Sequence, residues 1–288
     1  MEQRIIQTVF GTIETGETAT LFRIPNHTDD YIEITNYGCM TKSIHIHDRR
    51  GELRNVLCGC ETLEDCRQRE RGTVYDGLSP ALSACLAHKL WEIKEVGENY
   101  VFFSCQVSKA ESGLDTALTF GARIMWVNLN RIVMDLFAAP EKECRMAPGC
   151  HLAFQLTERD DYILRTFCPQ MISGDKTVPA ENTVYADMAF VPLKTGPQIF
   201  RSPQESMKPM AELASGAAGL AVSSYGDMDS LICEKSPDGS VSIEQSMLRG
   251  VQLKSGESFS GRVIYGFDRL YAEEELKNPT PSPFSAFL

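Results

Sequence analysis

The sequence predicts an all-β protein, a large antiparallel β-sandwich with a few short helices. Short segments rich in β-branched and aromatic residues follow one another, most of them separated by Gly, Asn, Asp or Pro. DRRGE at 48–52, PDGS at 237–240 and KSGES at 254–258 each place Gly in a turn between alternating segments. Helical periodicity is scarce. Many strands at such spacing favour a sandwich or barrel.

The strands are expected along the whole chain, wherever such a segment lies between two turn signals. They cover 18–26, 31–38, 42–48, 99–108, 119–139, 151–156, 219–226, 231–236, 241–246 and 260–267. Three segments could form short helices, namely 61–71, 81–93 and the acidic 269–277. No internal repeat or linker composition divides the chain. We therefore predict one domain over 1–276 and a proline-rich tail over 277–288.

Composition excludes several classes of partner. The formal net charge of −11 argues against nucleic acid or an anionic membrane surface. The opening MEQRIIQTVFG has an acid at position 2 and no long apolar core, so we expect no signal peptide. No stretch approaches the roughly 18 apolar residues that a spanning helix needs. The expectation is a cytoplasmic protein without a membrane partner, either a monomer or a homodimer.

The chain has 10 cysteines, which could serve as metal ligands, disulfides or buried thiols. Cys58 and Cys60 are the only close pair, and no second pair follows at zinc-ribbon spacing. We therefore expect free, buried thiols in a reducing cytosol. Cys150 precedes His151, but adjacent strand residues face opposite sides, so the two are not expected to pair.

The segment PGCHLAFQL at 148–156 alternates between large hydrophobic residues and smaller or polar ones. Leu152, Phe154 and Leu156 face one side of the predicted strand, and His151 faces the other. His151 therefore either meets water or lines a polar pocket. The same alternation in 241–246 turns Glu244 away from the core.

The order of motifs resembles that of the aldose 1-epimerases, or galactose mutarotases. A Phe-Gly pair at 10–11 is followed by TNYG at 35–38, DRRG at 48–51 and NVLCGCETLED at 55–65. The resemblance continues in LAVSSYG at 220–226 and SIEQSMLRGVQLKSGESFSGRVIYGF at 242–267. It covers most of the chain in order, with gaps. It implies the β-supersandwich of that family and a free sugar as the partner.

The resemblance also implies site residues. PGCHLAFQL places His151 at the position of the family's acid histidine, and VSIEQS places Glu244 at its catalytic glutamate. YADMAFVPL places Asp187 at an aspartate that binds sugar hydroxyls. Interconverting α and β anomers requires a base at the O1 hydroxyl and an acid at the ring oxygen O5. No cofactor and no metal ion are needed for this reaction.

The chain departs from the family in the interval from Arg67 to Ile93, which is much shorter. Ser83 stands where a second active-site histidine would fall. Arg71 could replace a missing sugar-binding arginine, and His88 could supply the second imidazole. Trp91 resembles the family's tryptophan after this motif. An aromatic wall for the sugar could come from Phe154, Trp91 and Phe190.

Three functions remain open at this stage. The first is an active mutarotase with His151 as acid and Glu244 as base. The second is a non-catalytic carbohydrate-binding or regulatory relative. The third acts on a phosphorylated hexose, with the phosphate near Arg67, Arg69 and Arg71, although Glu70 lies among them. His27, His45 and His47 are expected at the surface.

Overall fold

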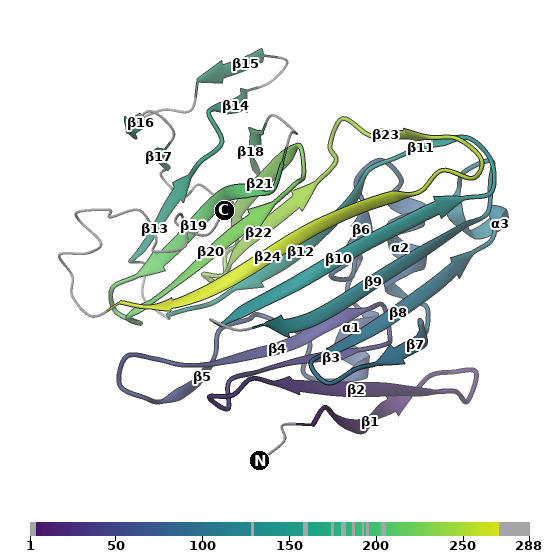
Figure 1. Ribbon diagram of the computed structural model, residues 1–288, viewed down its shortest axis with the longest axis horizontal. Helices are drawn as coiled ribbons and strands as arrows, with labels where there is room; N and C mark the ends of the chain where they lie inside the picture. Colours follow the sequence, from purple (N-terminus) through teal and green to yellow (C-terminus); the bar gives the residue numbers. More distant parts are fainter. Residues whose placement is uncertain are drawn as a thin grey trace.

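The computed structural model describes most of residues 4–270, and short gaps interrupt this range. The gaps are 128–129, 158–160, 174–175, 180–182, 186–187, 192, 194–195 and 203–205. Strands dominate this part of the chain, which forms antiparallel sheets with three short helices (Figure 1). The predicted tail over 277–288 and nearly all of the predicted helix over 269–277 lie outside the described residues.

The largest sheet in the described chain has ten strands and forms one layer of the sandwich. In spatial order they are β16 (Thr183–Tyr185), β17 (Met188–Val191), β13 (Tyr162–Thr166), β19 (Lys208–Ser215), β20 (Leu220–Gly226), β24 (Phe259–Arg269), β10 (Arg131–Pro140), β9 (Leu118–Val127), β8 (Tyr100–Val107) and β7 (Glu92–Val96).

Two further sheets pack on this layer, and a short pair joins the loops at one end. The five-stranded sheet runs β1 (Ile6–Thr12), β2 (Thr18–Pro25), β3 (Tyr31–Thr35), β4 (Met40–His47) and β5 (Leu53–Asn55). The seven-stranded sheet runs β15 (Lys176–Pro179), β14 (Gln170–Ser173), β18 (Gln198–Arg201), β21 (Ser230–Lys235), β22 (Val241–Ser246), β12 (Pro148–Phe154) and β6 (Val74–Asp76). The short pair is β11 (Cys144–Met146) with β23 (Val251–Leu253).

One hydrophobic core joins the three large sheets. Phe22 on β2 packs edge-on against Phe103 on β8, with ring centroids 5.5 Å apart. Phe154 on β12 packs against Tyr265 and Phe267 on β24, with centroids 5.5 and 6.3 Å apart. All five rings belong to the same cluster of buried residues. The predicted β-sandwich is therefore confirmed.

Each predicted strand is present in the structure, although most of the predicted ends are shifted and one predicted strand is divided into two. The predicted strand over 119–139 is two strands, β9 and β10, which pair with each other. The chain turns between them at Asn130, which has a positive φ of 52°. The three Gly turns occur as predicted, with Gly51, Gly239 and Gly256 all at positive φ.

The helices are shorter than predicted. α1 spans Leu63–Arg67 instead of 61–71, and its N-terminus is closed by a capping box between Thr62 and Asp65. α2 spans Pro80–Ala87 instead of 81–93. It ends there because the following residues pair with 36–38, where Lys89 accepts from Gly38 and Trp91 donates to Asn36. A third helix, α3 (Lys109–Ser112), was not predicted.

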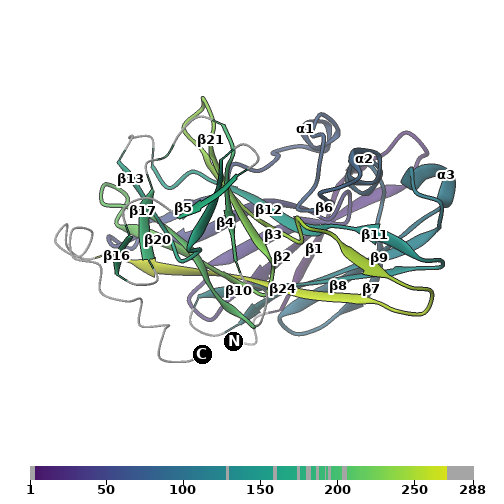
Figure 2. The same ribbon diagram turned by 90° about the horizontal axis from the view of Figure 1, so that it is seen from above.

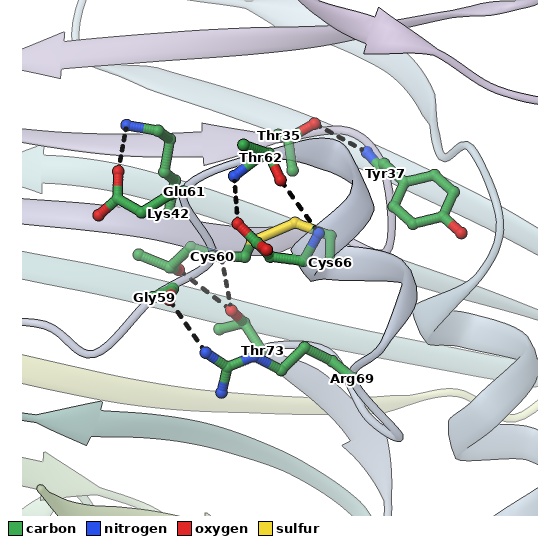
Figure 3. Close-up of a disulfide and its surroundings, with 12 residues drawn as sticks. Thr35, Tyr37, Lys42, Gly59, Cys60, Glu61, Thr62, Cys66, Arg69 and Thr73 are labelled. Atoms are coloured by element: carbon green, nitrogen blue, oxygen red, sulfur yellow. Dashed lines mark hydrogen bonds and ion pairs between the residues drawn. A yellow bond between two sulfur atoms is a disulfide. The ribbon is translucent and has the colours of Figure 1, made fainter. Parts of the chain in front are cut away.

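The cysteine prediction is wrong for one pair. Cys60 and Cys66 form a disulfide, with their Cα atoms 5.4 Å apart, and the other cysteines are free (Figure 3). The turn at Glu61 and Thr62 starts α1 and brings Cys66 back against Cys60. Cys60 and Cys66 are six residues apart, so no close spacing marked them as a pair in the sequence.

Both ribbon views place α2 near β6, and Figure 2 shows α1 and α2 on the side away from β10 and β24. α2 therefore lies at the end of the seven-stranded sheet where β6 pairs with β12. Within the described residues, no helix combines the length and apolar character that crossing a membrane would require.

The disulfide predicts a thiol count. Alkylation of the unfolded protein without reductant should modify the eight free cysteines, and all 10 should react after reduction. Intact-mass spectrometry reads both numbers directly. The Cys66→Ser variant should show nine reactive thiols with or without reductant, since Cys60 then has no partner. Modification of all 10 before reduction would contradict the Cys60–Cys66 bond.

Candidate active site

His151 and Glu244 come from neighbouring strands of the seven-stranded sheet. In the antiparallel pairing of β12 with β22, they lie directly opposite each other. The His151 amide donates to the Thr73 carbonyl on the other side of β12, at 2.9 Å. His151 and Glu244 are therefore a non-hydrogen-bonded pair, the kind in which opposing side chains come closer. Residues far apart in sequence share one small area of the sheet.

The two faces of these strands differ as the alternation predicted. Leu152 and Phe154 on β12 and Ile243 on β22 are buried in the core. His151 is only partly buried, and Glu244 projects from the same side of the sheet. The predicted polar face therefore exists, and it holds both proposed acid–base residues.

The Glu244 carboxylate is almost fully buried, at 4% exposure, and both of its oxygens have partners. Arg71 Nη1 lies 2.7 Å from Oε2. The Tyr75 hydroxyl donates to Oε1. The Arg71 guanidinium also stacks on the Tyr75 ring, with Cζ 5.1 Å from its centroid. Glu244, Arg71 and Tyr75 thus form one cluster.

Burial raises the pKa of Glu244, while the Arg71 charge and the Tyr75 hydrogen bond oppose this rise. A raised pKa makes an ionised carboxylate a stronger base. Burial and the neighbouring Glu244 charge raise the pKa of Tyr75 well above its usual value. Tyr75 therefore keeps its proton at neutral pH and acts as the hydrogen-bond donor.

A small pocket of about 50 Å³ adjoins His151. Its residues come from the ends of β4 and β12 and from the segments 57–60 and 69–73. They are Met40, Thr41, Leu57, Cys58, Gly59, Cys60, Arg69, Arg71, Gly72, Thr73, His151, Leu152 and Ala153. This lining contains two arginines and no acidic residue. The only formal charges on the lining are therefore positive, although the chain as a whole is acidic, and that of Arg71 is paired with Glu244 outside the lining.

A backbone hydrogen bond holds the segment 57–60 beside β12, and a side-chain hydrogen bond joins the segment 69–73 to it. Cys58 donates to the Ala153 carbonyl at 2.8 Å. Arg69 Nη2 donates to the Gly59 carbonyl at 2.9 Å, next to the Cys60–Cys66 disulfide (Figure 3). No carboxylate in the described part of the chain pairs with Arg69.

The pocket changes the expected protonation of His151. Burial, and then the positive charges of Arg71 and Arg69, lower the pKa of His151 to about 3. The imidazole is therefore neutral near pH 7. A histidine with the unperturbed pKa near 6.5 could supply a proton near neutral pH, as expected from the sequence, and the depressed pKa removes this ability from His151.

Of the other predicted binding residues, only Arg71 lies at this site. Trp91 is buried in the core, where Nε1 donates to the Leu86 carbonyl at 2.9 Å. His88 is exposed at the end of α2, with Nδ1 3.5 Å from the Tyr37 hydroxyl. Neither Trp91 nor His88 lines the pocket. Asp187 lies outside the described residues.

The expected aromatic wall is also absent from the described lining. Phe154 points into the core against Tyr265 and Phe267, so it cannot stack on a sugar at this pocket. The side chain of Phe190 is outside the described part of the structure. Ser83 is a structural residue, since its hydroxyl accepts from the Asp76 amide and donates to the Asp76 carbonyl.

The remaining histidines play no part in the pocket. Ile44 and Ile46 are buried, and His45 and His47 lie on the opposite face, as expected. His47 Nδ1 lies 2.6 Å from the Asp30 carboxylate. Among the described residues, no group of three or more His, Cys, Asp or Glu is arranged to hold a metal ion.

Sequence reasoning missed Tyr75, the hydroxyl partner of Glu244. Tyr75 lies in the interval from Arg67 to Ile93, where the family resemblance gave it no role. The available signal was a tyrosine directly before the Asp76-Gly77 pair. This tyrosine can be connected with Glu244 only from the structure, in which β6 pairs with β12.

Comparisons with solved structures identify the fold. A GalM/aldose epimerase homologue from C. elegans superposes with a TM-score of 0.77 at 11% identity, covering 88% of this chain and 100% of its own. Galactose 1-epimerase from Lactobacillus acidophilus NCFM gives 0.72 at 12% identity, covering 93% and 99%. A galactose mutarotase-like protein from Clostridium acetobutylicum gives 0.69 at 10% identity, covering 93% and 99%.

Searches against protein-family models and against curated proteins found no match. Identities this low establish a shared fold and leave activity open. The resemblance noted in the sequence is therefore confirmed for the architecture: this chain has the fold of galactose mutarotase and aldose epimerase homologues.

The positive pocket predicts an unusual titration of His151. Its ring nitrogens should show no protonation by ¹H–¹⁵N NMR between about pH 8 and pH 5, where an unperturbed histidine titrates. Replacing Arg69 by Gln removes one positive charge and should move the pKa of His151 upwards from about 3. The His151→Gln variant assigns the signal.

The same depressed pKa affects stability with a definite sign. Between about pH 6.5 and the folded value near 3, the unfolded chain binds a proton at this position and the folded chain does not. The contribution of His151 to stability is therefore lost as the pH falls through this window. A His151 midpoint close to 6.5 in the folded protein would contradict the described pocket.

Proposed function

We propose that this protein is an aldose 1-epimerase that interconverts the α and β anomers of a free hexose. The observation that carries the proposal is the cross-strand pair of His151 and Glu244 on a polar face, in which His151 lines the pocket and Glu244 pairs with the lining residue Arg71. The fold shared with aldose epimerase homologues supports it. The motif order in the sequence supports the same assignment of residues.

In the proposed reaction Glu244 is the base. It removes the proton from the O1 hydroxyl of the sugar, and the C1–O5 bond then breaks to leave an aldehyde at C1. After rotation about the C1–C2 bond, O5 attacks the opposite face of the aldehyde. Glu244 returns the proton to O1 and ends in its starting state. No proton is consumed over the cycle.

His151 acts at the ring oxygen in this proposal. A neutral imidazole does not readily release its remaining proton, so His151 donates a hydrogen bond to O5. This bond stabilises the negative charge that O5 carries while the ring is open. A neutral histidine serves as an electrophile in the same way in triosephosphate isomerase. Arg69 and Arg71 add positive charge on the same side, which favours the anionic intermediate.

Sugar binding is assigned to fewer residues than the sequence suggested. Arg71 combines its ion pair to Glu244 with a position in the pocket lining, so it is kept as a binding residue. Asp187 is kept on the resemblance alone. His88 and Trp91 are dropped from the proposal, since neither lines the pocket.

The proposal predicts the effect of Glu244→Gln. Polarimetry on freshly dissolved α-D-glucose and α-D-galactose should show acceleration by the unaltered protein. The variant should lose about 10²–10⁴-fold in rate, because glutamine keeps the shape of the side chain but cannot accept the O1 proton. Far-ultraviolet circular dichroism should show an unchanged fold.

Glu95→Gln is the matched control, because Glu95 also accepts from a tyrosine hydroxyl, that of Tyr100, but lies on the exposed edge strand β7. It should keep the full rate. A full rate in Glu244→Gln removes Glu244 from the base role. No acceleration of any sugar, together with sugar binding in calorimetry, would identify a non-catalytic carbohydrate-binding homologue instead.

A second candidate function is mutarotation of a phosphorylated hexose. The pocket lining supports it, since Arg69 and Arg71 are present without an acidic residue. Planar guanidinium groups bind phosphate through paired hydrogen bonds. Arg69 is bonded only to the Gly59 carbonyl in the described chain, so its charge is free to pair with a phosphate.

Arg69→Gln separates the two candidates. For a phosphorylated substrate, KM for glucose 6-phosphate should rise about tenfold or more, since a hydrogen bond to a charged group is lost. KM for free glucose should change little. If KM for glucose 6-phosphate, like KM for free glucose, is the same in the variant as in the unaltered protein, Arg69 does not recognise phosphate.

A further inference from the structure

Tyr75 reaches Glu244 from two strands away. β6 pairs with β12, and β12 pairs with β22, so β12 lies between the tyrosine and the glutamate. Neighbouring strands are about 4.8 Å apart, which separates β6 from β22 by about 9.6 Å. The phenol crosses this distance over the face of β12 and donates to Glu244 Oε1.

Gly149 makes this crossing possible. It lies opposite Tyr75 on one side and opposite Ser246 on the other. A Cβ atom at position 149 would lie 2.6 Å from Tyr75 Cζ and hydroxyl and 2.7 Å from Ser246 Cβ. Contacts this short do not occur, so any larger residue would displace the ring. The missing side chain at 149 is the space that Tyr75 occupies.

Tyr75 does not contact the pocket itself. It is 3% exposed and is not one of the lining residues. One of its faces is covered by the Arg71 guanidinium. Its hydroxyl therefore acts on the proposed chemistry through Glu244, and together with Arg71 it fixes both carboxylate oxygens.

We propose that Tyr75 is the positioning residue for the base. Its hydroxyl reaches across β12 and holds the Glu244 carboxylate ionised and directed at the sugar. The proposal rests on the proposed function of Glu244. A carboxylate offers about four lone-pair sites. Tyr75 takes one on Oε1 and Arg71 takes one on Oε2, so accepting sites remain for the O1 proton.

The phenol favours the charged form of Glu244 because a protonated carboxyl group accepts its hydrogen bond less well. Loss of a hydrogen bond to a charged group corresponds to about one to two pKa units. Removing the hydroxyl should therefore raise the pKa of Glu244 by about that amount. The base would then be ionised only at higher pH.

The other ionisable groups around Glu244 do not supply this hydrogen bond. On its own face, Arg71 favours the charged form, Glu234 opposes it, and His151 is neutral. Through the sheet, on the core side, lie Cys150, Cys233 and Tyr265, whose pKa values are raised by burial, so all three are neutral.

The test is the Tyr75→Phe variant, measured in two ways. The pKa of Glu244 is read by ¹³C NMR in protein labelled at the glutamate carboxyl carbons, with Glu244→Gln assigning the signal. It should rise by about one to two units. The acid limb of the kcat/KM profile for the sugar should move to higher pH by the same amount. KM on the high-pH plateau should stay unchanged, because Tyr75 does not touch the sugar.

Tyr100→Phe is the matched control, since Tyr100 donates to Glu95 at 2.6 Å on the surface. It should alter neither the Glu244 signal nor the profile. If Tyr75→Phe does not fold, 3-fluorotyrosine in place of Tyr75 tests the same bond. Its more acidic phenol donates more strongly and should lower the pKa of Glu244.

The two readouts separate this inference from the proposed function. An unchanged Glu244 pKa in Tyr75→Phe overturns the positioning role, as does a loss of rate without movement of the acid limb. A raised Glu244 pKa in a protein that accelerates no sugar supports the positioning role and overturns the mutarotase assignment instead.

Discussion

The burial of the Glu244 carboxylate is the constraint on which the rest of the site depends. An unpaired charge in the interior costs several kcal/mol, so a buried carboxylate needs close partners. Arg71 and Tyr75 meet this need from one short segment, and that segment must therefore lie against β12. The glycine at 149 follows from the same requirement, because the tyrosine ring has to pass over it.

A second consequence is the sign of the local charge. The chain is strongly acidic, yet the segment that neutralises Glu244 also brings Arg69 and Arg71 beside His151. The imidazole is therefore kept neutral, so in the proposed reaction it donates a hydrogen bond to the oxygen that becomes negative. In that proposal Glu244 carries the proton and the cationic pocket stabilises the opened sugar.

The chain also shows how a fold can persist at low sequence identity. Solved structures with only 10–12% identity share its architecture over most of its length. In the interval from Arg67 to Ile93, a serine stands where the family resemblance implies a histidine, and that serine is used to close a turn with Asp76. Tyr75 in the same interval donates a hydrogen bond to Glu244.

Local sequence patterns were enough to predict the class of fold and which face of the key strands is buried. Alternation of large hydrophobic residues with polar ones is a local property, because successive strand residues point to opposite sides. It therefore predicted that Leu152 and Phe154 are buried and that His151 and Glu244 face away from the core. The turns at Gly51, Gly239 and Gly256 could be predicted equally well, since a backbone with positive φ favours glycine.

Which distant residues come into contact depends on how the strands pair in three dimensions. The pairing of β6 with β12 and of β12 with β22 sets Tyr75, His151 and Glu244 side by side, and strand order is not encoded within any one segment. The same holds for Cys60 and Cys66, which depend on the turn before α1, and for Trp91, which packing draws into the core. The pKa of His151 depends on charges from another segment, so its chemistry could not be read from its own strand.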